Sequence, residues 1–177
     1  MNQTVSLSAP AKVNLFLRVL RRRSDGFHEL ETLFQAIDYC DDVFVELNDL
    51  GQVSLEVTGL EVGPVKDNLA YRAASAYREA AGLQEGIHVR LTKHIPAGAG
   101  LGGGSSDAAA VLRGLDYLTG GLLDTEALKK IASNIGSDVS FFLCRSTTAL
   151  AHGRGEILEP IKRLPEETLL LMLPPVH

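Results

Sequence analysis

A glycine-rich segment carries the clearest chemical signal in this sequence. It runs Pro96-Ala97-Gly98-Ala99-Gly100-Leu101-Gly102-Gly103-Gly104-Ser105-Ser106 and contains five glycines. Glycine allows positive φ angles and lets backbone approach a ligand closely. The residues that follow, 107–118, have a helical pattern, so free N–H groups would gather at a helix N-terminus, where phosphate binds. The segment therefore predicts a phosphate-binding loop; the alternative is a flexible linker.

Two charged residues outside this loop lie where phosphoryl chemistry could use them. Lys12 stands in an otherwise apolar strand, and burying an unpaired ammonium group is costly. A carboxylate partner such as Asp138 would remove that cost. Asn14, two residues further on, points to the same face of the strand and is expected to bind substrate or to orient Lys12. The alternatives are an exposed edge-strand position for Lys12 and a helix N-cap role for Asp138.

The spacing of apolar residues predicts the elements that position these groups. Alternation predicts strands at 13–19, 29–37, 43–47, 53–57 and 87–91, with further strands at 146–151 and 168–173. Helical periods and capping residues predict helices at 68–81, 107–118 and 124–135. Ser105 or Ser106 is expected to cap the second helix. The predicted fold class is α+β, a largely antiparallel sheet with helices on one face.

Composition limits the class of protein. The chain has 177 residues, a net charge of −5 and 45% hydrophobic residues, enough for one core. It has no long basic run, which argues against nucleic acid as a partner. No apolar run approaches membrane-spanning length and no signal-peptide pattern is present, so we expect no membrane partner and a cytoplasmic location. Cys40 and Cys144 are expected to be free thiols.

The neighbours of the glycine-rich segment distinguish three kinds of nucleotide-binding loop. The glycines at 98, 100 and 103 satisfy a dinucleotide fingerprint, but that unit requires a second parallel strand where this sequence predicts another helix. A P-loop requires a lysine near its end, and the segment has none. The order Pro-x-x-x-Gly-Leu-Gly resembles the phosphate loop of the GHMP kinases, which include galactokinase, homoserine kinase and mevalonate kinase.

The resemblance extends along the whole sequence. Its motifs are Pro10-Ala11-Lys12-Val13-Asn14-Leu15-Phe16-Leu17, Asp25-Gly26-Phe27-His28-Glu29-Leu30, Thr32-Leu33-Phe34-Gln35, Asp67-Asn68-Leu69, Gly136-Ser137-Asp138-Val139 and Gly153-Arg154-Gly155-Glu156. In this order they are similar to the GHMP kinases that phosphorylate the 2-hydroxyl of cytidine diphosphate-methylerythritol in non-mevalonate isoprenoid synthesis. The resemblance implies a GHMP N-terminal domain, related to domain 2 of ribosomal protein S5, over residues 1–165. Residues 166–177 are expected to form a crossover strand toward a C-terminal domain.

The same resemblance implies roles for individual residues. It makes Asp138 the general base and Lys12 its partner, and it makes ATP and Mg²⁺ the cofactors. Residues 96–106 would bind ATP together with two further residues, Lys93 and Asn68. Asn14 would contact the small-molecule substrate, with Phe27 and His28 at its cytidine. The resemblance implies no dedicated metal site, and Ser106 is the side chain expected nearest to the Mg²⁺ that ATP carries.

Members of this family are longer and carry a third, Gly-Thr-Gly-like motif in a C-terminal domain, which this sequence lacks. We therefore expect the 177-residue chain to fold, to self-associate and to phosphorylate poorly or not at all. Two other interpretations remain open. One is a different GHMP kinase, such as a homoserine or mevalonate kinase. The other is a domain that binds nucleotide without turnover.

Overall fold

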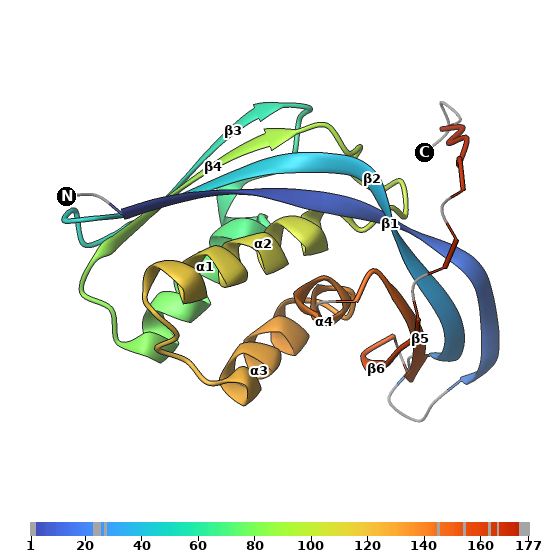
Figure 1. Ribbon diagram of the computed structural model, residues 1–177. Coiled ribbons are helices and arrows are strands. Elements are labelled where there is room, and N and C mark those ends of the chain that lie inside the picture. The colour runs from blue at the N-terminus through green and yellow to red at the C-terminus, as the bar shows by residue number, and fades with distance from the viewer. Residues whose placement is uncertain are drawn as a thin grey trace.

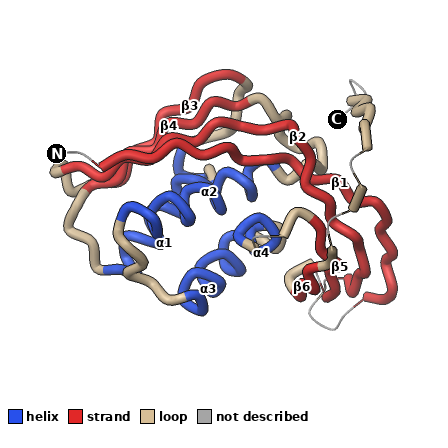
Figure 2. Tube along the Cα trace, in the orientation of Figure 1, coloured by secondary structure: helices blue, strands red, loops and turns tan. Residues whose placement is uncertain are grey.

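The computed structural model describes residues 3–22, 26, 28–144, 146–153, 155–162, 164–165 and 167–173. Helices cover one face of a single curved sheet, and the long strands of the sheet continue past the helices at one end (Figures 1 and 2). None of the helices in this part of the chain has the length and apolar character needed to cross a bilayer. The layered arrangement agrees with the predicted α+β class.

The sheet has six strands, β1 (Gln3–Arg22), β2 (His28–Asn48), β3 (Val53–Gly59), β4 (Gly86–Lys93), β5 (Thr148–Gly153) and β6 (Ile157–Pro160). Their order is β3-β4-β2-β5-β6, with β1 paired to β2. The β3–β4 pair is parallel and the other pairs are antiparallel. The prediction of a largely antiparallel sheet is therefore confirmed.

Strands β1 and β2 form one long antiparallel ribbon that extends from the part of the sheet that contains β4 to the part that contains β5. The segments 29–37 and 43–47, predicted as two strands, belong to the single strand β2. Residues 42–48 of β2 pair with β4, while residues 30–35 pair with β5. Breaks in the β1–β2 register occur between Pro10 and Ala11 and between Asn14 and Phe16. Such bulges bend a strand, and these bends carry the ribbon from one part of the sheet to the other.

Four α-helices and one short 3₁₀ helix complete the described fold: η1 (Val65–Asp67), α1 (Leu69–Ala81), α2 (Gly103–Leu118), α3 (Thr125–Ile135) and α4 (Val139–Leu143). The side chain of Asn68 caps α1 by accepting a 2.9 Å hydrogen bond from the N–H of Ala70. Asp124 caps α3 in the same way. These two predicted helices are confirmed.

Two predictions about secondary structure are wrong, one about where a helix begins and one about the presence of a strand. Helix α2 begins at Gly103 instead of residue 107, because Gly102 at its N-cap adopts a left-handed φ of 70° and turns the loop directly into the helix. Ser105 and Ser106 consequently lie inside the helix and cap nothing. The strand expected at 168–173 is absent, since the described residues 167–173 pair with no strand. Its apolar residues Leu169 to Leu173 are exposed at the surface.

The core lies between the sheet and helices α1 and α2. The buried residues of β2 and β4, including Val43, Val45 and Val89, face the alanine-rich sides of the two helices. Small side chains let α2 approach the sheet closely, and a Cβ on Gly114 would lie only 3.0 Å from Leu7 on β1. Helix α2 is therefore held firmly, which fixes the position of its N-terminus.

Candidate functional site

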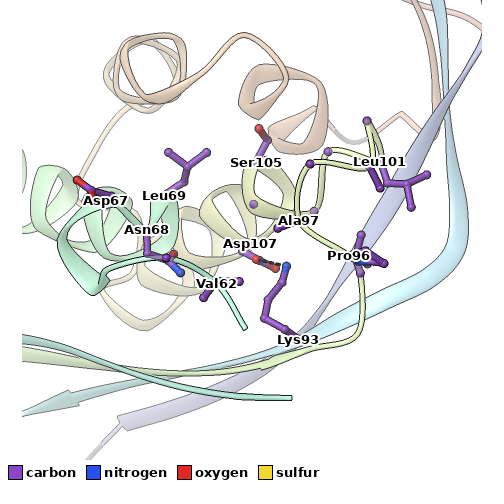
Figure 3. A pocket seen from close by; sticks show the side chains of 18 of the residues that line it. Val62, Asp67, Asn68, Leu69, Lys93, Pro96, Ala97, Leu101, Ser105 and Asp107 are labelled. Atoms are coloured by element: carbon purple, nitrogen blue, oxygen red, sulfur yellow. Dashed lines mark hydrogen bonds and ion pairs between the residues drawn. The ribbon is translucent and has the colours of Figure 1, made fainter. Parts of the chain in front are cut away.

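The glycine-rich segment forms the loop between β4 and α2 and borders a cavity of about 310 Å³ (Figure 3). Gly98, Gly100 and Gly102 have φ angles of 75°, 73° and 70°. Residues with a Cβ rarely adopt this left-handed region. The loop thus reaches the N-terminus of α2, whose first N–H groups have no side-chain cap. Free N–H groups and the positive end of the helix dipole make this end of the cavity suited to an anion.

The loop is attached directly to strand β1. The backbone N–H of Lys12 donates a 2.9 Å hydrogen bond to the carbonyl oxygen of Leu101. Leu101 is itself buried with Ala11 and Ile95. A Cβ on Gly102 would lie 3.1 Å from the Cγ of Lys12, so the loop also packs against the aliphatic part of that side chain. The end of the loop and Lys12 therefore occupy fixed positions relative to each other.

Lys12 and Asp138 form an ion pair beside the end of the loop. The Lys12 Nζ lies 3.6 Å from Asp138 Oδ2, and the two side chains are 8% and 30% exposed. The ammonium also lies over the ring of Phe34, 5.1 Å from its centroid. Asp138 precedes α4, but its side chain makes no capping hydrogen bond. Its carboxylate is therefore paired with a buried cation while the side chain stays partly exposed to solvent.

A series of hydrogen bonds fixes the position of the Lys12 ammonium. The Lys12 ammonium donates to Asn14 Oδ1 at 2.7 Å, and Asn14 Nδ2 donates to Thr32 Oγ1 at 2.7 Å. The hydroxyl of Thr32 in turn donates to the carbonyl oxygen of Phe16 at 2.7 Å. The structure thus brings Asn14 and Lys12 together, as the sequence predicted. Thr32 belongs to one of the quoted motifs, but sequence reasoning gave it no role; its hydroxyl is fully buried in β2.

Lys93 lines the cavity, but its ammonium lies between two buried carboxylates. It donates to Asp41 and, at 2.8 Å, to Asp107 Oδ2. Burial raises the pKa of Asp107 to about 7, although the neighbouring Lys93 ammonium opposes that shift. Sequence reasoning missed Asp41 and Asp107 as parts of the site. The signal that could have identified them is the presence of one lysine and two aspartates within apolar segments.

Of the other residues predicted to bind ATP, some line the cavity and one is buried away from it. Asn68 lines the cavity, although its side-chain oxygen is also the cap of α1. Ser105 lines the cavity as well. Ser106 is fully buried, and its hydroxyl has no hydrogen-bond partner in the described part of the chain. Of the two serines, Ser105 is the one that borders the cavity. The described residues contain no cluster of three metal-ligating side chains.

Of the two predicted cytidine contacts, the structure describes only His28, which does not line this cavity. Phe27 is outside the described residues. His28 is exposed at the start of β2 and pairs with Arg22 of β1. It therefore lies near the end of the β1–β2 ribbon, beyond the residues that pair with β5. The structure does not test a cytidine-binding role for either residue.

Comparisons with known proteins agree with this geometry. Residues 68–146 match the family model described as GHMP kinases N terminal domain. The chain is 45% identical over 174 residues to 4-diphosphocytidyl-2-C-methyl-D-erythritol kinase of Geobacter metallireducens, covering 97% of this chain and 61% of that protein. It is 44% identical over 171 residues to the kinase of the same name from Shouchella clausii, covering 97% of this chain and 57% of that protein. The chain thus spans somewhat less than two thirds of these curated relatives.

Solved structures place the fold in the same group. A crystal structure of 4-(cytidine 5'-diphospho)-2C-methyl-D-erythritol kinase is 47% identical, with a TM-score of 0.75 over 89% of this chain and 55% of that chain. Homoserine kinase from Cytophaga hutchinsonii, at 24% identity, shares the fold with a TM-score of 0.61 over 90% of this chain and 51% of that chain. The fold, the glycine-rich loop and these similarities agree: the chain has the fold of a GHMP kinase N-terminal domain, and residues 68–146 match the model of that family.

Proposed function

We propose that this chain supplies the ATP-binding loop and the general base of a kinase that phosphorylates the 2-hydroxyl of 4-diphosphocytidyl-2-C-methyl-D-erythritol. The observation that carries the proposal is the Lys12–Asp138 ion pair, 3.6 Å long, beside the end of a glycine-rich loop that is bonded to Lys12 itself. The names of the similar proteins support the choice of substrate.

The cavity beside the loop suits a nucleotide phosphate chain. Left-handed glycines let the backbone of the loop pass close to a ligand there, and α2 adds the positive end of a dipole. ATP bound here would supply the γ-phosphoryl group, and its Mg²⁺ would neutralise phosphate charge. Phosphate oxygens and water would hold the ion, with Ser105 as the serine that borders the cavity.

Asp138 is proposed to accept the proton of the substrate hydroxyl as that oxygen attacks phosphorus. Its side chain is 30% exposed, which leaves room for a substrate to reach the carboxylate. Lys12 holds the carboxylate in place, and its charge stabilises negative charge that develops in the transition state. Asn14 and Thr32 hold Lys12 through the 2.7 Å hydrogen bonds described above. General-base catalysis of this kind contributes about 10²–10⁴-fold.

A coupled ADP-release assay tests the proposal. The 177-residue chain is incubated with ATP, Mg²⁺ and 4-diphosphocytidyl-2-C-methyl-D-erythritol, with homoserine and mevalonate as matched alternative acceptors. We expect any ADP release to occur only with the cytidine-linked acceptor and to be slow in the 177-residue chain. Release with homoserine or mevalonate instead would overturn the assigned substrate. Calorimetry with MgATP alone distinguishes an active kinase from a domain that binds nucleotide without turnover. Such a domain would bind ATP and release no ADP with any acceptor.

A further inference from the structure

Three buried charged residues form a triad beneath the glycine-rich loop. The ammonium of Lys93, the last residue of β4, contacts the carboxylates of Asp41 on β2 and Asp107 on α2. Figure 3 shows Lys93 extending from β4 toward Asp107 on the helix. The three side chains are at most 3% exposed. Charges this deeply buried require partners, and each member of the triad supplies one.

Asp41 holds the beginning of the loop. Its Oδ1 accepts hydrogen bonds from the backbone N–H groups of His94, at 2.6 Å, and Ile95, at 2.8 Å. These two residues immediately precede Pro96, where the loop begins. The other oxygen of Asp41 accepts the hydrogen bond from Lys93. The chain that leaves β4 is therefore attached to β2 at three consecutive residues.

Asp107 holds the end of the loop through the same ammonium. It lies in the second turn of α2, and its Oδ2 accepts a 2.8 Å hydrogen bond from Lys93. Gly103, the first residue of α2, packs on the same group. A Cβ there would lie 3.2 Å from Lys93 Nζ and 2.9 Å from Ile95 Cγ2. The start and the end of the loop thus meet at a single buried cation.

We propose that Asp41, Lys93 and Asp107 form a clamp that fixes the separation between the two ends of the loop, residues 96–102, and act as positioning residues for the phosphates of the nucleotide. The inference rests on the proposed nucleotide-binding role of this loop. A glycine-rich segment gains conformational freedom when its ends are free, and ordering it around phosphate would cost affinity. The clamp removes part of that cost before the ligand arrives. Lys93 then acts through the loop and not by contact with adenosine.

Asp107→Ala removes the contact between Lys93 and α2 and leaves the hydrogen bonds of Asp41 in place. It leaves a balanced Asp41–Lys93 pair in the core. Asp107→Asn keeps the shape and one acceptor oxygen, so it should restore part of the effect. Asp49→Asn is the control, because this carboxylate is exposed in the turn after β2, at the opposite end of β4 from Lys93.

Two measurements test the clamp. Calorimetry gives the dissociation constants of MgATP and of inorganic tripolyphosphate, a probe that carries no adenosine. Hydrogen exchange by mass spectrometry reports on residues 94–104 without ligand. For Asp107→Ala we expect both ligands to bind about tenfold more weakly or worse and the loop to exchange faster. Asp107→Asn should give intermediate values, and Asp49→Asn should match the wild type.

Weakened binding of MgATP with unchanged binding of tripolyphosphate would overturn the clamp, because the triad would then act on adenosine. Unchanged affinities with unchanged exchange would overturn it as well. If Asp107→Ala does not fold, the isosteric Asp107→Asn carries the same comparison. A wild type that binds neither ligand would overturn the nucleotide-binding function, and loop exchange alone would then decide whether the triad holds the loop.

Discussion

The backbone N–H of Lys12 donates a 2.9 Å hydrogen bond to the carbonyl oxygen of Leu101. This bond joins the strand that carries the buried lysine to the last turn of the glycine-rich loop. The Lys12 side chain then pairs with Asp138 at 3.6 Å. The proposed phosphate-binding loop and the candidate general base therefore share one attachment point, and catalysis by positioning depends on such fixed geometry.

Asp138→Asn should lower turnover by about 10²–10⁴-fold while MgATP affinity changes little. The amide keeps the size of the side chain but cannot accept the substrate proton. Steady-state assays of the protein form that shows activity, with calorimetry for ATP, measure the two effects. Asp49→Asn, at an exposed turn residue, is the control. Wild-type turnover in Asp138→Asn would exclude the general-base role.

Gly100→Ala and Gly103→Ala should affect binding and folding differently. Gly100 is exposed, has nothing within 4 Å of an added Cβ and adopts a φ of 73°. The left-handed conformation costs an alanine about 1–2 kcal/mol, and the free loop can relax to avoid it. ATP affinity should therefore fall about tenfold with little change in Tm.

Gly103→Ala, in contrast, should lower the Tm more than it lowers ATP affinity. An added Cβ would lie 2.9 Å from the buried side chain of Ile95, and overpacking of this kind costs about 1–3 kcal/mol of stability. Thermal unfolding and calorimetry on both variants separate the two cases. A Gly100→Ala protein with lowered Tm and unchanged ATP affinity would mean that this part of the loop is structural.

Thr32→Val should lower both stability and turnover, and Thr32→Ser should restore them in part. Valine has the same shape but leaves Asn14 Nδ2 and the carbonyl oxygen of Phe16 without their partner. Loss of such buried hydrogen bonds costs about 1–3 kcal/mol. Because Asn14 holds Lys12, we expect kcat to fall more than KM rises. Denaturant unfolding and steady-state kinetics test this, and equal kcat in all three proteins would contradict it.

The ionisation of Asp107 should make stability depend on pH. Burial raises its pKa from 3.8 to about 7 in the folded chain, so the folded state binds a proton that the unfolded state releases. This contribution is present in full below pH 3.8 and is lost as pH rises through about 7. Relative to Asp107→Asn, the wild type should lose about 1 kcal/mol per pH unit over that range. Urea unfolding of both proteins from pH 4 to 8 measures the difference, and parallel curves would contradict it.

Phe27→Ala should weaken a cytidine nucleotide by about 1–3 kcal/mol if the aromatic ring stacks on cytosine. The expectation derives from the resemblance of residues 25–30 to the family motif. Calorimetry with cytidine diphosphate measures it, with adenosine diphosphate as the comparison ligand. Equal affinity of wild type and variant for the cytidine nucleotide would remove Phe27 from the site.

Local sequence was sufficient for most secondary structure and for the pieces of the site. Alternation identified β4, caps identified α1 and α3, and glycine content identified the loop, because each of these depends on residues close together in the chain. An apolar strand around Lys12 also predicted a carboxylate partner such as Asp138, whose Oδ2 lies 3.6 Å from the Lys12 ammonium.

Only the tertiary structure decided which distant residues share one environment. The side chain of Thr32 becomes a support for Asn14 only because the long β1–β2 ribbon brings these strands together. Asp41 and Asp107 meet at Lys93 only because α2 packs tightly on the sheet. The early start of α2 likewise depends on Gly102, whose missing Cβ leaves room for Lys12. Burial and pairing of charges are properties of the packed chain, and no periodicity within a single segment encodes them.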